Sequence, residues 1–173
     1  MLDLDNLKYI NDTYGHDMGD AYIRCMAASL PSPDGERCLV ARMSGDEFFV
    51  LFHGYDTQEE VRGQIALLRQ RMTRASLTLP DGVRQPVRAS GGVAWYPADS
   101  DRFDELVRYA DFAMYQVKNS GKGEFAEFDG EAYRRDAYLV QSRGVLHRLL
   151  EQRLVDYHLS LIHISEPTRR SYI

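Results

Sequence analysis

Apolar residues recur at three- and four-residue intervals along several segments of the chain, which is the spacing of an amphipathic helix. This pattern predicts helices over residues 17–30, 57–75 and 103–119, and a more polar helix over 130–158. Asp56 and Thr57, followed by two glutamates, suit a helix start because acids stabilise the positive end of the helix dipole. The three apolar stripes are Met18, Tyr22, Met26 and Leu30; Val61, Ile65, Leu68 and Met72; and Leu106, Ala110, Ala113, Met114 and Val117.

Short β-rich runs lie between the predicted helices. They predict strands over residues 1–5, 37–43, 47–53, 87–95 and 125–128. The second and third runs are separated by Ser-Gly-Asp, which predicts a hairpin with a tight, glycine-containing tip. A further hairpin is predicted ahead of the 87–95 strand. Because strands and helices alternate, we predict an α/β fold with a central sheet flanked by helices, close to a nucleotide-polymerase palm. The pattern leaves the strand order open.

Composition narrows the classes of partner. The chain has 173 residues, of which 44% are apolar and 27% charged, and its net charge is −5. Nucleic acid is not an expected partner because polyanions prefer basic surfaces, whereas one nucleotide can bind through a metal and a few cations. Cys25 and Cys38 lack zinc-ligand spacing and are expected to be reduced thiols of a cytoplasmic protein. We expect no membrane segment and no signal peptide, since apolar runs fall short of the ~20 residues that a span needs.

Four acidic residues are candidates for metal binding. Asp3 and Asp5 end the predicted first strand, and we expect only one of them to face a given site. Asp46 and Glu47 lie at the hairpin tip and are expected to point apart. If the hairpin lies beside the first strand, one acid from each converges. Two carboxylates with a backbone carbonyl suit Mg²⁺ that also holds phosphate oxygens. The alternative is that these are ordinary solvated acids of surface loops.

Three separate motifs resemble those of the GGDEF family of diguanylate cyclase domains, and they occur in the same order. The motifs are LDLDNLKYINDTYGHDMGD at 2–20, RMSGDEF at 42–48 and YQVKNSGK at 115–122. The resemblance spans residues 2–128 and implies a central, mostly antiparallel sheet flanked by helices, as in nucleotide cyclases and polymerase palms. It also implies that two GTP molecules and a divalent metal, Mg²⁺ or Mn²⁺, are used to make cyclic di-GMP and pyrophosphate.

The resemblance further implies roles for individual residues. The implied metal ligands are the carboxylates of Asp3, Asp46 and Glu47 and the carbonyl of Leu4. Asp46 and Glu47 are the implied catalytic acids, Glu47 through metal binding or through activation of the attacking 3′-hydroxyl. The implied substrate-binding residues are Asn11 and Asp20 for guanine, Ser44 and Gly45 in the signature turn, and Lys118 and Lys122 for the triphosphate. Residue chemistry agrees, since an amide and a carboxylate match the acceptor and donors on the guanine edge. For the lysines alone, the alternative is solvated side chains at a helix end.

Two positions depart from the family pattern. Ser44 stands where the family usually has its first signature glycine, which is costly if that position needs positive φ. Its hydroxyl could instead donate to phosphate. The family's Arg-x-x-Asp inhibitory site for product would fall at residues 35–38, where Gly, Glu, Arg and Cys stand. The arginine and the aspartate are both absent from their places, so no inhibitory site is predicted.

The two ends of the chain also differ from the family pattern. The domain, residues 1–129, begins within its first strand, so we expect its N-terminal helix to be missing and an apolar patch to be exposed. The segment 130–158 resembles a linker helix toward an EAL phosphodiesterase domain, which is absent. Residues 159–173 resemble a translated sequencing adapter and are interpreted as an artefactual tail.

The sequence is consistent with two alternative functions. The first is an active diguanylate cyclase in bacterial second-messenger signalling, which requires a homodimer because each half-site brings one GTP. The second is a catalytically weak, GTP-binding regulatory domain of a GGDEF–EAL phosphodiesterase, favoured by Ser44 and by the linker. The intact acids and lysines favour the enzyme, with activity expected of the intact parent domain rather than of this chain alone.

Overall fold

The computed structural model describes residues 1–31 and 37–137, which belong to two compact units divided after Phe128. The elements of the first unit, in order, are β1 (Leu2–Leu4), α1 (Leu7–Tyr14), α2 (His16–Ser29), β2 (Cys38–Ser44), β3 (Glu47–Phe52), α3 (Gln58–Arg74), β4 (Ser76–Thr78), β5 (Arg84–Pro86), β6 (Ala89–Val93), α4 (Phe103–Ser120) and β7 (Phe125–Glu127). In the second unit, residues 130–137 are helical, and the backbone N–H groups of Glu131 and Ala132 donate to the Asp129 carboxylate. The rest of the helix predicted over 130–158 and the tail at 159–173 lie outside the described residues.

A five-stranded sheet in the order β2-β3-β1-β6-β7 forms the centre of the first unit. Every neighbouring pair is antiparallel except β6 and β7, which are parallel. The predicted mostly antiparallel sheet is therefore confirmed, and β1 is its middle strand. Strands β4 and β5 form a separate hairpin. In the register around β1, Asp3 is opposite Glu47 of β3 on one side and opposite Ser90 of β6 on the other.

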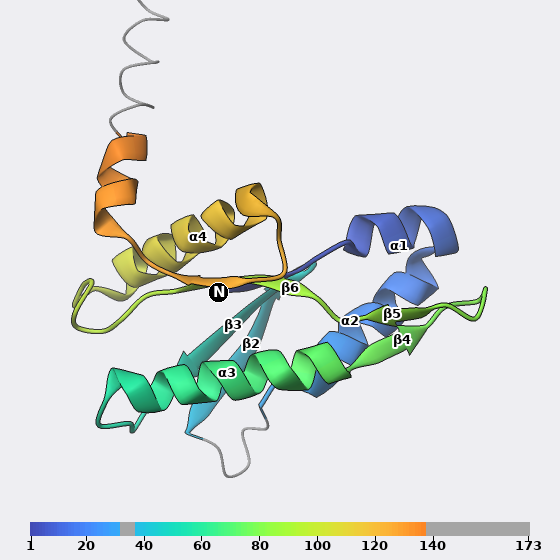
Figure 1. Cartoon of the computed structure of the whole chain (residues 1–173), viewed down its shortest axis with the longest axis horizontal. Helices are drawn as coiled ribbons and strands as arrows, with labels where there is room; N and C mark the ends of the chain where they lie inside the picture. The colour runs from blue at the N-terminus through green and yellow to red at the C-terminus, as the bar shows by residue number, and fades with distance from the viewer. Residues whose placement is uncertain (32–36, 138–173) are drawn as a thin grey trace, which may run out of the picture. The chain divides into compact units, whose positions relative to one another are not determined.

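Helices cover both faces of this sheet (Figure 1). Leu2, Leu4 and Phe48 turn one face toward α2 and α3 and join a buried core with the apolar stripes of those helices. Helix α4 covers the opposite face, on the far side of the sheet from α3 in Figure 1. It packs directly on β6, because a Cβ atom added to Gly92 would lie 1.9 Å from the carbonyl oxygen of Ala110. The last turn of α4 reaches the middle strand, where Lys118 pairs with Asp3 of β1 at 2.7 Å.

Helix α1 is the element that the hydrophobic pattern did not predict. Its sequence, LKYINDTY, is rich in residues of modest helix propensity, and its N-cap Asn6 has a left-handed backbone (φ 66°) with no side-chain cap. The helix is stabilised instead by burial of Leu7 and Ile10 in the core beside β1. The helices predicted over 17–30, 57–75 and 103–119 are confirmed to within one or two residues, as is the 37–53 hairpin.

A capping box begins α3, as the acids near Thr57 suggested. The Glu60 N–H donates to Thr57 Oγ1, and the Glu60 carboxylate accepts from the Thr57 N–H in return. Replacing Thr57 with alanine should destabilise the fold by about 1 kcal/mol, because a first-turn N–H loses its acceptor. Thr73→Ala, on the same helix but away from the cap, is the control and should change stability by about 0.5 kcal/mol or less. Urea unfolding measures both, and equal effects of the two substitutions would contradict this role for the cap.

Candidate active site

Asp3 of β1 and Asp46 of the hairpin tip line one cleft, whereas Ser44, Gly45 and Glu47 are not among its lining residues. The Leu4 N–H donates to the Asp46 carbonyl at 3.0 Å, which joins the end of β1 to the turn between β2 and β3. Asp3 and Glu47 are directly opposite each other in the register, so their side chains leave the same face of the sheet. The cleft has a volume of about 480 Å³. Among the residues that line it are Asp3, Leu4, Asp46, Lys118 and Lys122. The structure thus brings together acids and lysines from three distant segments.

The expectation that only one of Asp3 and Asp5 faces the site is wrong. Positions two apart in a strand point to the same face, and both carboxylates line the cleft. Their partners differ. The Asp3 carboxylate pairs with the Lys118 ammonium at 2.7 Å, whereas Asp5 accepts hydrogen bonds from Ser90 and from the backbone of Gly123. Asp3 therefore contacts Lys118 of α4, whereas Asp5 contacts the turn that follows α4.

The ion pair between Asp3 and Lys118 is influenced by further acids nearby. Burial raises the pKa of Asp3, and the nearby charges of Asp46 and Asp5 add to that rise, while the hydrogen bond with Lys118 opposes it. Desolvation opposes protonation of Lys118, but its hydrogen bond to Asp3 and the charges of Asp3, Asp46 and Glu47 raise its pKa above the usual value. Acids outnumber lysines by one in the lining of the cleft, which holds Asp3, Asp5, Asp12 and Asp46 beside Lys8, Lys118 and Lys122. This excess of negative charge favours the arrival of a further cation.

The oxygen atoms in this cleft fit a hard divalent cation that arrives with its substrate. Within residues 1–31 and 37–137, no three Asp, Glu, His or Cys side chains are arranged to hold a metal by themselves. The cleft instead offers two carboxylates, Asp3 and Asp46, beside the backbone of Leu4. Mg²⁺ is commonly bound by one or two carboxylates together with phosphate oxygens and water. The donor set suits a metal–triphosphate complex rather than a metal cage made by protein alone.

The signature turn accommodates Ser44 without backbone strain. Among the described residues other than glycine, positive φ occurs only at Asn6 and Lys122, while Gly45 takes the left-handed position of the turn at φ 39°. The Gly45 carbonyl accepts two hydrogen bonds from the Arg42 guanidinium, at 2.9 and 2.7 Å. The Ser44 hydroxyl donates to the Glu47 carboxylate at 2.8 Å. The serine therefore orients a site acid in this structure.

Asn11 and Asp20 lie on the helix pair that follows β1. Asn11 is half-buried on α1 and Asp20 is exposed on α2. A Cβ atom at Gly19 would be 1.8 Å from the Asn11 Oδ1 atom, so the absence of a side chain there lets Asn11 lie against the start of α2. Asn11 therefore lies against Gly19, the residue that precedes Asp20. Asn11 and Asp20 are not among the residues that line the 480 Å³ cleft, although Asp12, which follows Asn11, is one of them.

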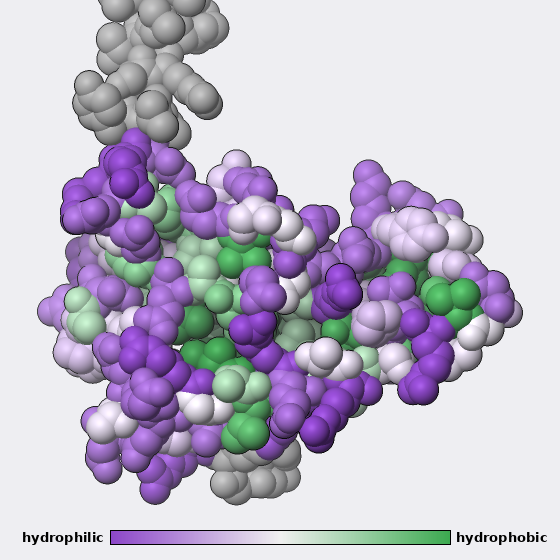
Figure 2. Space-filling view, in the orientation of Figure 1, coloured by the Kyte–Doolittle hydropathy of each residue, from purple (hydrophilic) through white to green (hydrophobic). Residues whose placement is uncertain are grey.

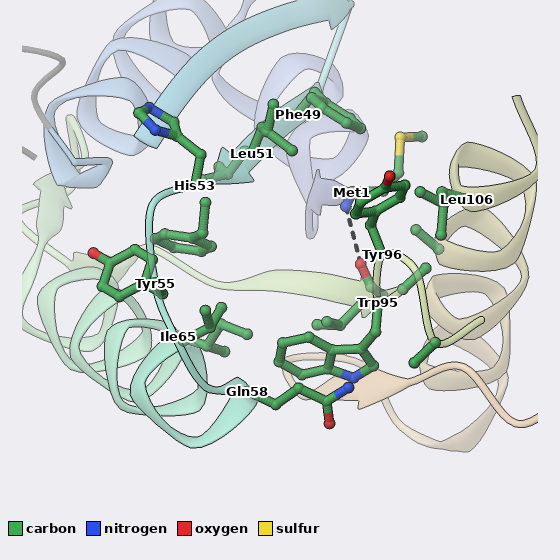
Figure 3. A pocket seen from close by; sticks show the side chains of 18 of the residues that line it. Met1, Phe49, Leu51, His53, Tyr55, Gln58, Ile65, Trp95, Tyr96 and Leu106 are labelled. Carbon is green, nitrogen blue, oxygen red and sulfur yellow. Dashed lines mark hydrogen bonds between the residues drawn. The ribbon is translucent and has the colours of Figure 1, made fainter. Parts of the chain in front are cut away.

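A second, apolar cleft opens between α3 and α4. Figure 2 shows apolar side chains gathered there, and Figure 3 shows Phe49, Leu51, Ile65, Trp95 and Leu106 around it. Its volume is about 730 Å³, and it also reaches the first residue of the chain, whose amino group donates to the Gly92 carbonyl. The apolar cleft contains none of the acids or lysines of the other cleft.

Sequence reasoning missed Ser90 and the contacts of Asp5. Ser90 is fully buried in β6, where it donates to Asp5 at 2.9 Å. The available signal was a serine within a run of small and apolar strand residues, because a buried hydroxyl requires a partner. The cleft lining also includes Lys8, Tyr9 and Asp12, which the motifs had not singled out.

Together, the sheet, the acids and the lysines define an α/β domain suited to a metal-bound nucleoside triphosphate. The sequence matches the family "Diguanylate cyclase, GGDEF domain" over residues 1–124, and the chain belongs to this family. The GGDEF domain of TpbB (YfiN) from Pseudomonas aeruginosa has the same fold, with a TM-score of 0.66 and 29% identity over 77% of each chain. The predicted palm-like GGDEF fold is therefore confirmed.

Two relatives from Pseudomonas aeruginosa are much longer than this chain. This chain is 31% identical over 157 residues to "Cyclic di-GMP phosphodiesterase NbdA", and the match covers 91% of this chain and 20% of that protein. This chain is also 30% identical over 159 residues to "Bifunctional diguanylate cyclase/cyclic di-GMP phosphodiesterase MucR", and the match covers 91% of this chain and 22% of that protein. The chain thus spans about a fifth of the length of these curated relatives. No helix among the described residues is long and apolar enough to cross a membrane.

Proposed function

We propose that this domain is a diguanylate cyclase, which condenses two GTP molecules into cyclic di-GMP and two pyrophosphates. The observation that carries the proposal is that Asp3, Asp46, Lys118 and Lys122 line a single cleft. In each of two steps, a ribose 3′-oxygen attacks the α-phosphorus of the other nucleotide. The 3′-hydroxyl loses its proton, a new P–O bond forms, and the bond to pyrophosphate breaks.

The roles proposed for the residues follow from their positions and chemistry. Asp3 and Asp46, with the carbonyl of Leu4, would hold Mg²⁺ or Mn²⁺, which neutralises charge on the phosphates. Lys118 and Lys122 would bind the triphosphate, and phosphoryl transfer depends chiefly on such positioning and charge stabilisation. Glu47 has one carboxylate oxygen bonded to Ser44. Its other oxygen is left to bind metal or to accept the proton of the 3′-hydroxyl.

The guanine base would be read by Asn11 and Asp20, and the packing of Asn11 against Gly19, the residue before Asp20, supports this assignment. Helix α1 follows β1 after two residues, so this short helix would connect phosphates at Asp3 to a base at these side chains. Two such half-sites must face each other, since each supplies one GTP. The active species is therefore proposed to be a homodimer.

A regulatory, GTP-binding domain is the second candidate, favoured by the similarity to the phosphodiesterase NbdA. On this alternative, GTP binds the cleft without turnover and adjusts a neighbouring EAL domain, which we place C-terminal in the parent protein. Cys25 and Cys38 are not joined to each other by a disulfide, which fits the reducing cytoplasm, where either protein would find GTP.

Incubation of the full-length protein with GTP and Mg²⁺ separates the two candidates. The cyclase produces cyclic di-GMP and pyrophosphate in a one-to-two ratio, and a chelator stops it. Binding of GTP with neither product would favour the regulator. Absence of both binding and turnover would reject both functions.

Product inhibition through the family's inhibitory position is not expected. Residues 35 and 36 lie outside the described residues, but Arg37 donates to the Gly54 carbonyl and stacks over Tyr55, and Cys38 is buried. Adding cyclic di-GMP to the assay at several times the product concentration should leave the initial rate within about twofold, the range of a weak surface contact. Strong inhibition that disappears on Arg37→Ala would overturn this expectation.

A further inference from the structure

Asp5 occupies a junction that joins three parts of the domain. It is the first residue after β1 and is 3% exposed. Its Oδ1 accepts from the Ser90 hydroxyl of β6 at 2.9 Å, and its Oδ2 accepts from the Gly123 N–H at 3.0 Å. The same N–H also points at the Ser90 hydroxyl oxygen, at 3.3 Å. Asp5 therefore ties the centre of the sheet to the turn after α4.

That turn has an unusual backbone. Gly121, Lys122 and Gly123 all have positive φ, at 137°, 64° and 73°. Two of them are glycines, for which this is ordinary, but Lys122 is in a region that side chains disfavour. A non-glycine residue stays in such a conformation only when its surroundings hold it there. Its own N–H donates to the Val117 carbonyl, and the next N–H is the one that Asp5 accepts.

The turn is fixed on both sides of Lys122. Helix α4 ends at Ser120, and the Glu124 carbonyl accepts from Gly91 as β7 begins its pairing with β6. Between these anchors, the Gly123 N–H is held to the sheet by the Asp5 carboxylate, and the Ser90 hydroxyl is a second, longer contact. Lys122 then lines the same cleft as Asp3 and Asp46.

We propose that Asp5 is a positioning residue, which acts through the Gly123 N–H to hold Lys122 in place for the phosphates of the nucleotide. This inference rests on the proposed function for the identity of the ligand but not for the contact itself. It gives the second acid of the β1 motif a role distinct from that of Asp3. Asp3 faces the cation on α4, and Asp5 shapes the turn that carries the next cation.

The positioning role and a purely electrostatic role of Asp5 predict opposite effects of its removal on GTP affinity. Removing a negative charge from the cleft should strengthen binding of an anionic nucleotide if Asp5 acts only through its field. Asp12→Ala, in the same cleft but without these bonds, measures that field effect and should leave GTP affinity equal or higher. Asp5→Ala should instead weaken GTP binding about tenfold, as the loss of a charge-assisted hydrogen bond does.

Two double substitutions test whether Asp5 acts through Lys122. Asp5→Ala combined with Lys122→Ala should bind GTP about as weakly as Lys122→Ala alone, since the turn no longer carries a cation to place. When Asp5→Ala is combined with Lys118→Ala, the two fold-losses of GTP affinity should multiply, because Lys118 is paired with Asp3 and not with the turn. Asp5→Asn should retain affinity within about threefold, because its amide oxygen can accept from Gly123 while its N–H donates to Ser90. Titration calorimetry of the full chain with GTP and Mg²⁺ gives all these affinities.

Amide exchange provides a readout that does not depend on GTP. In the apo chain, the Gly123 N–H should exchange about tenfold faster in Asp5→Ala than in the wild type or in Asp5→Asn. Unchanged exchange, tighter GTP binding by Asp5→Ala, or multiplying losses with Lys122→Ala would each overturn the proposal. If the wild type does not bind GTP, the proposed function fails while the exchange result still decides the contact. If Asp5→Ala does not fold, Asp5→Ser, too short to reach Gly123, takes its place in every comparison.

Discussion

Turnover of GTP is expected to fall about a thousandfold when Asp46 is replaced by asparagine. The carboxylate lines the cleft beside Asp3, and its backbone is hydrogen-bonded to Leu4, so the side chain is placed to share a cation with β1. A neutral amide is a weaker ligand, and metal stabilisation of the transition state contributes several kcal/mol. At about 1.4 kcal/mol per tenfold in rate, a loss of about 4 kcal/mol gives this factor.

Glu47→Gln should cause a loss of similar size if Glu47 binds metal or accepts the 3′-hydroxyl proton. The control is Asp17→Asn, an exposed acid at the start of α2, which should leave the rate unchanged. Rates are measured as cyclic di-GMP formed by the full-length protein, with circular dichroism to verify folding. A folded Asp46→Asn variant with wild-type turnover would remove Asp46 from the mechanism. Retained activity in Glu47→Gln would remove Glu47.

Replacing Gly92 with valine should destabilise the domain by about 3 kcal/mol or more. Its Cβ atom would lie 1.9 Å from the Ala110 carbonyl oxygen and 2.4 Å from the Met114 nitrogen, both backbone atoms of α4. Neither can move without displacing the helix, and overpacking of this kind typically costs about 1–3 kcal/mol and sometimes more. Typical domains are stable by only about 5–15 kcal/mol, so a large unfolded fraction is expected. Because α4 carries Lys118, the cleft would be disturbed as well.

Gly63→Ala is the matched control and should raise the free energy of unfolding, which Gly92→Val lowers. Gly63 lies within α3, and a Cβ atom there would meet nothing within 4 Å. Alanine should therefore stabilise the helix by about 0.5–1 kcal/mol. Urea unfolding followed by far-ultraviolet circular dichroism measures both variants. A Gly92→Val protein as stable as the wild type would show that α4 does not rest on β6 as described.

The predictable part of the fold is the part with regular periodicity. Helix α4 could be predicted because its apolar stripe, ending in Val117, has a clear spacing and stops at a glycine. Helix α1 could not, because its eight residues include only two buried apolar positions, Leu7 and Ile10. Its formation depends on contacts with β1 and α2, which no local window contains.

The candidate site was predictable to the extent that it lies within motifs. The meeting of Asp3 with the hairpin acids could be expected once the hairpin was assumed to lie beside the first strand. The hydrogen bond between Asp5 and Gly123 could not, because it joins residues 118 apart and involves a backbone N–H. Ser44 shows a third case. The sequence raised the possibility of strain, whereas the structure places positive φ on Gly45 and gives the serine a bond to Glu47.

The most direct test of the account is whether GTP binding to this chain depends on a divalent cation held by acids from two distant segments. Calorimetric titration with GTP, in Mg²⁺ and again in chelator, should give at least about tenfold weaker binding without the metal, and Asp3→Asn should reproduce that loss in Mg²⁺. Equal affinities in the presence and absence of Mg²⁺, with Asp3→Asn unaffected, would contradict it.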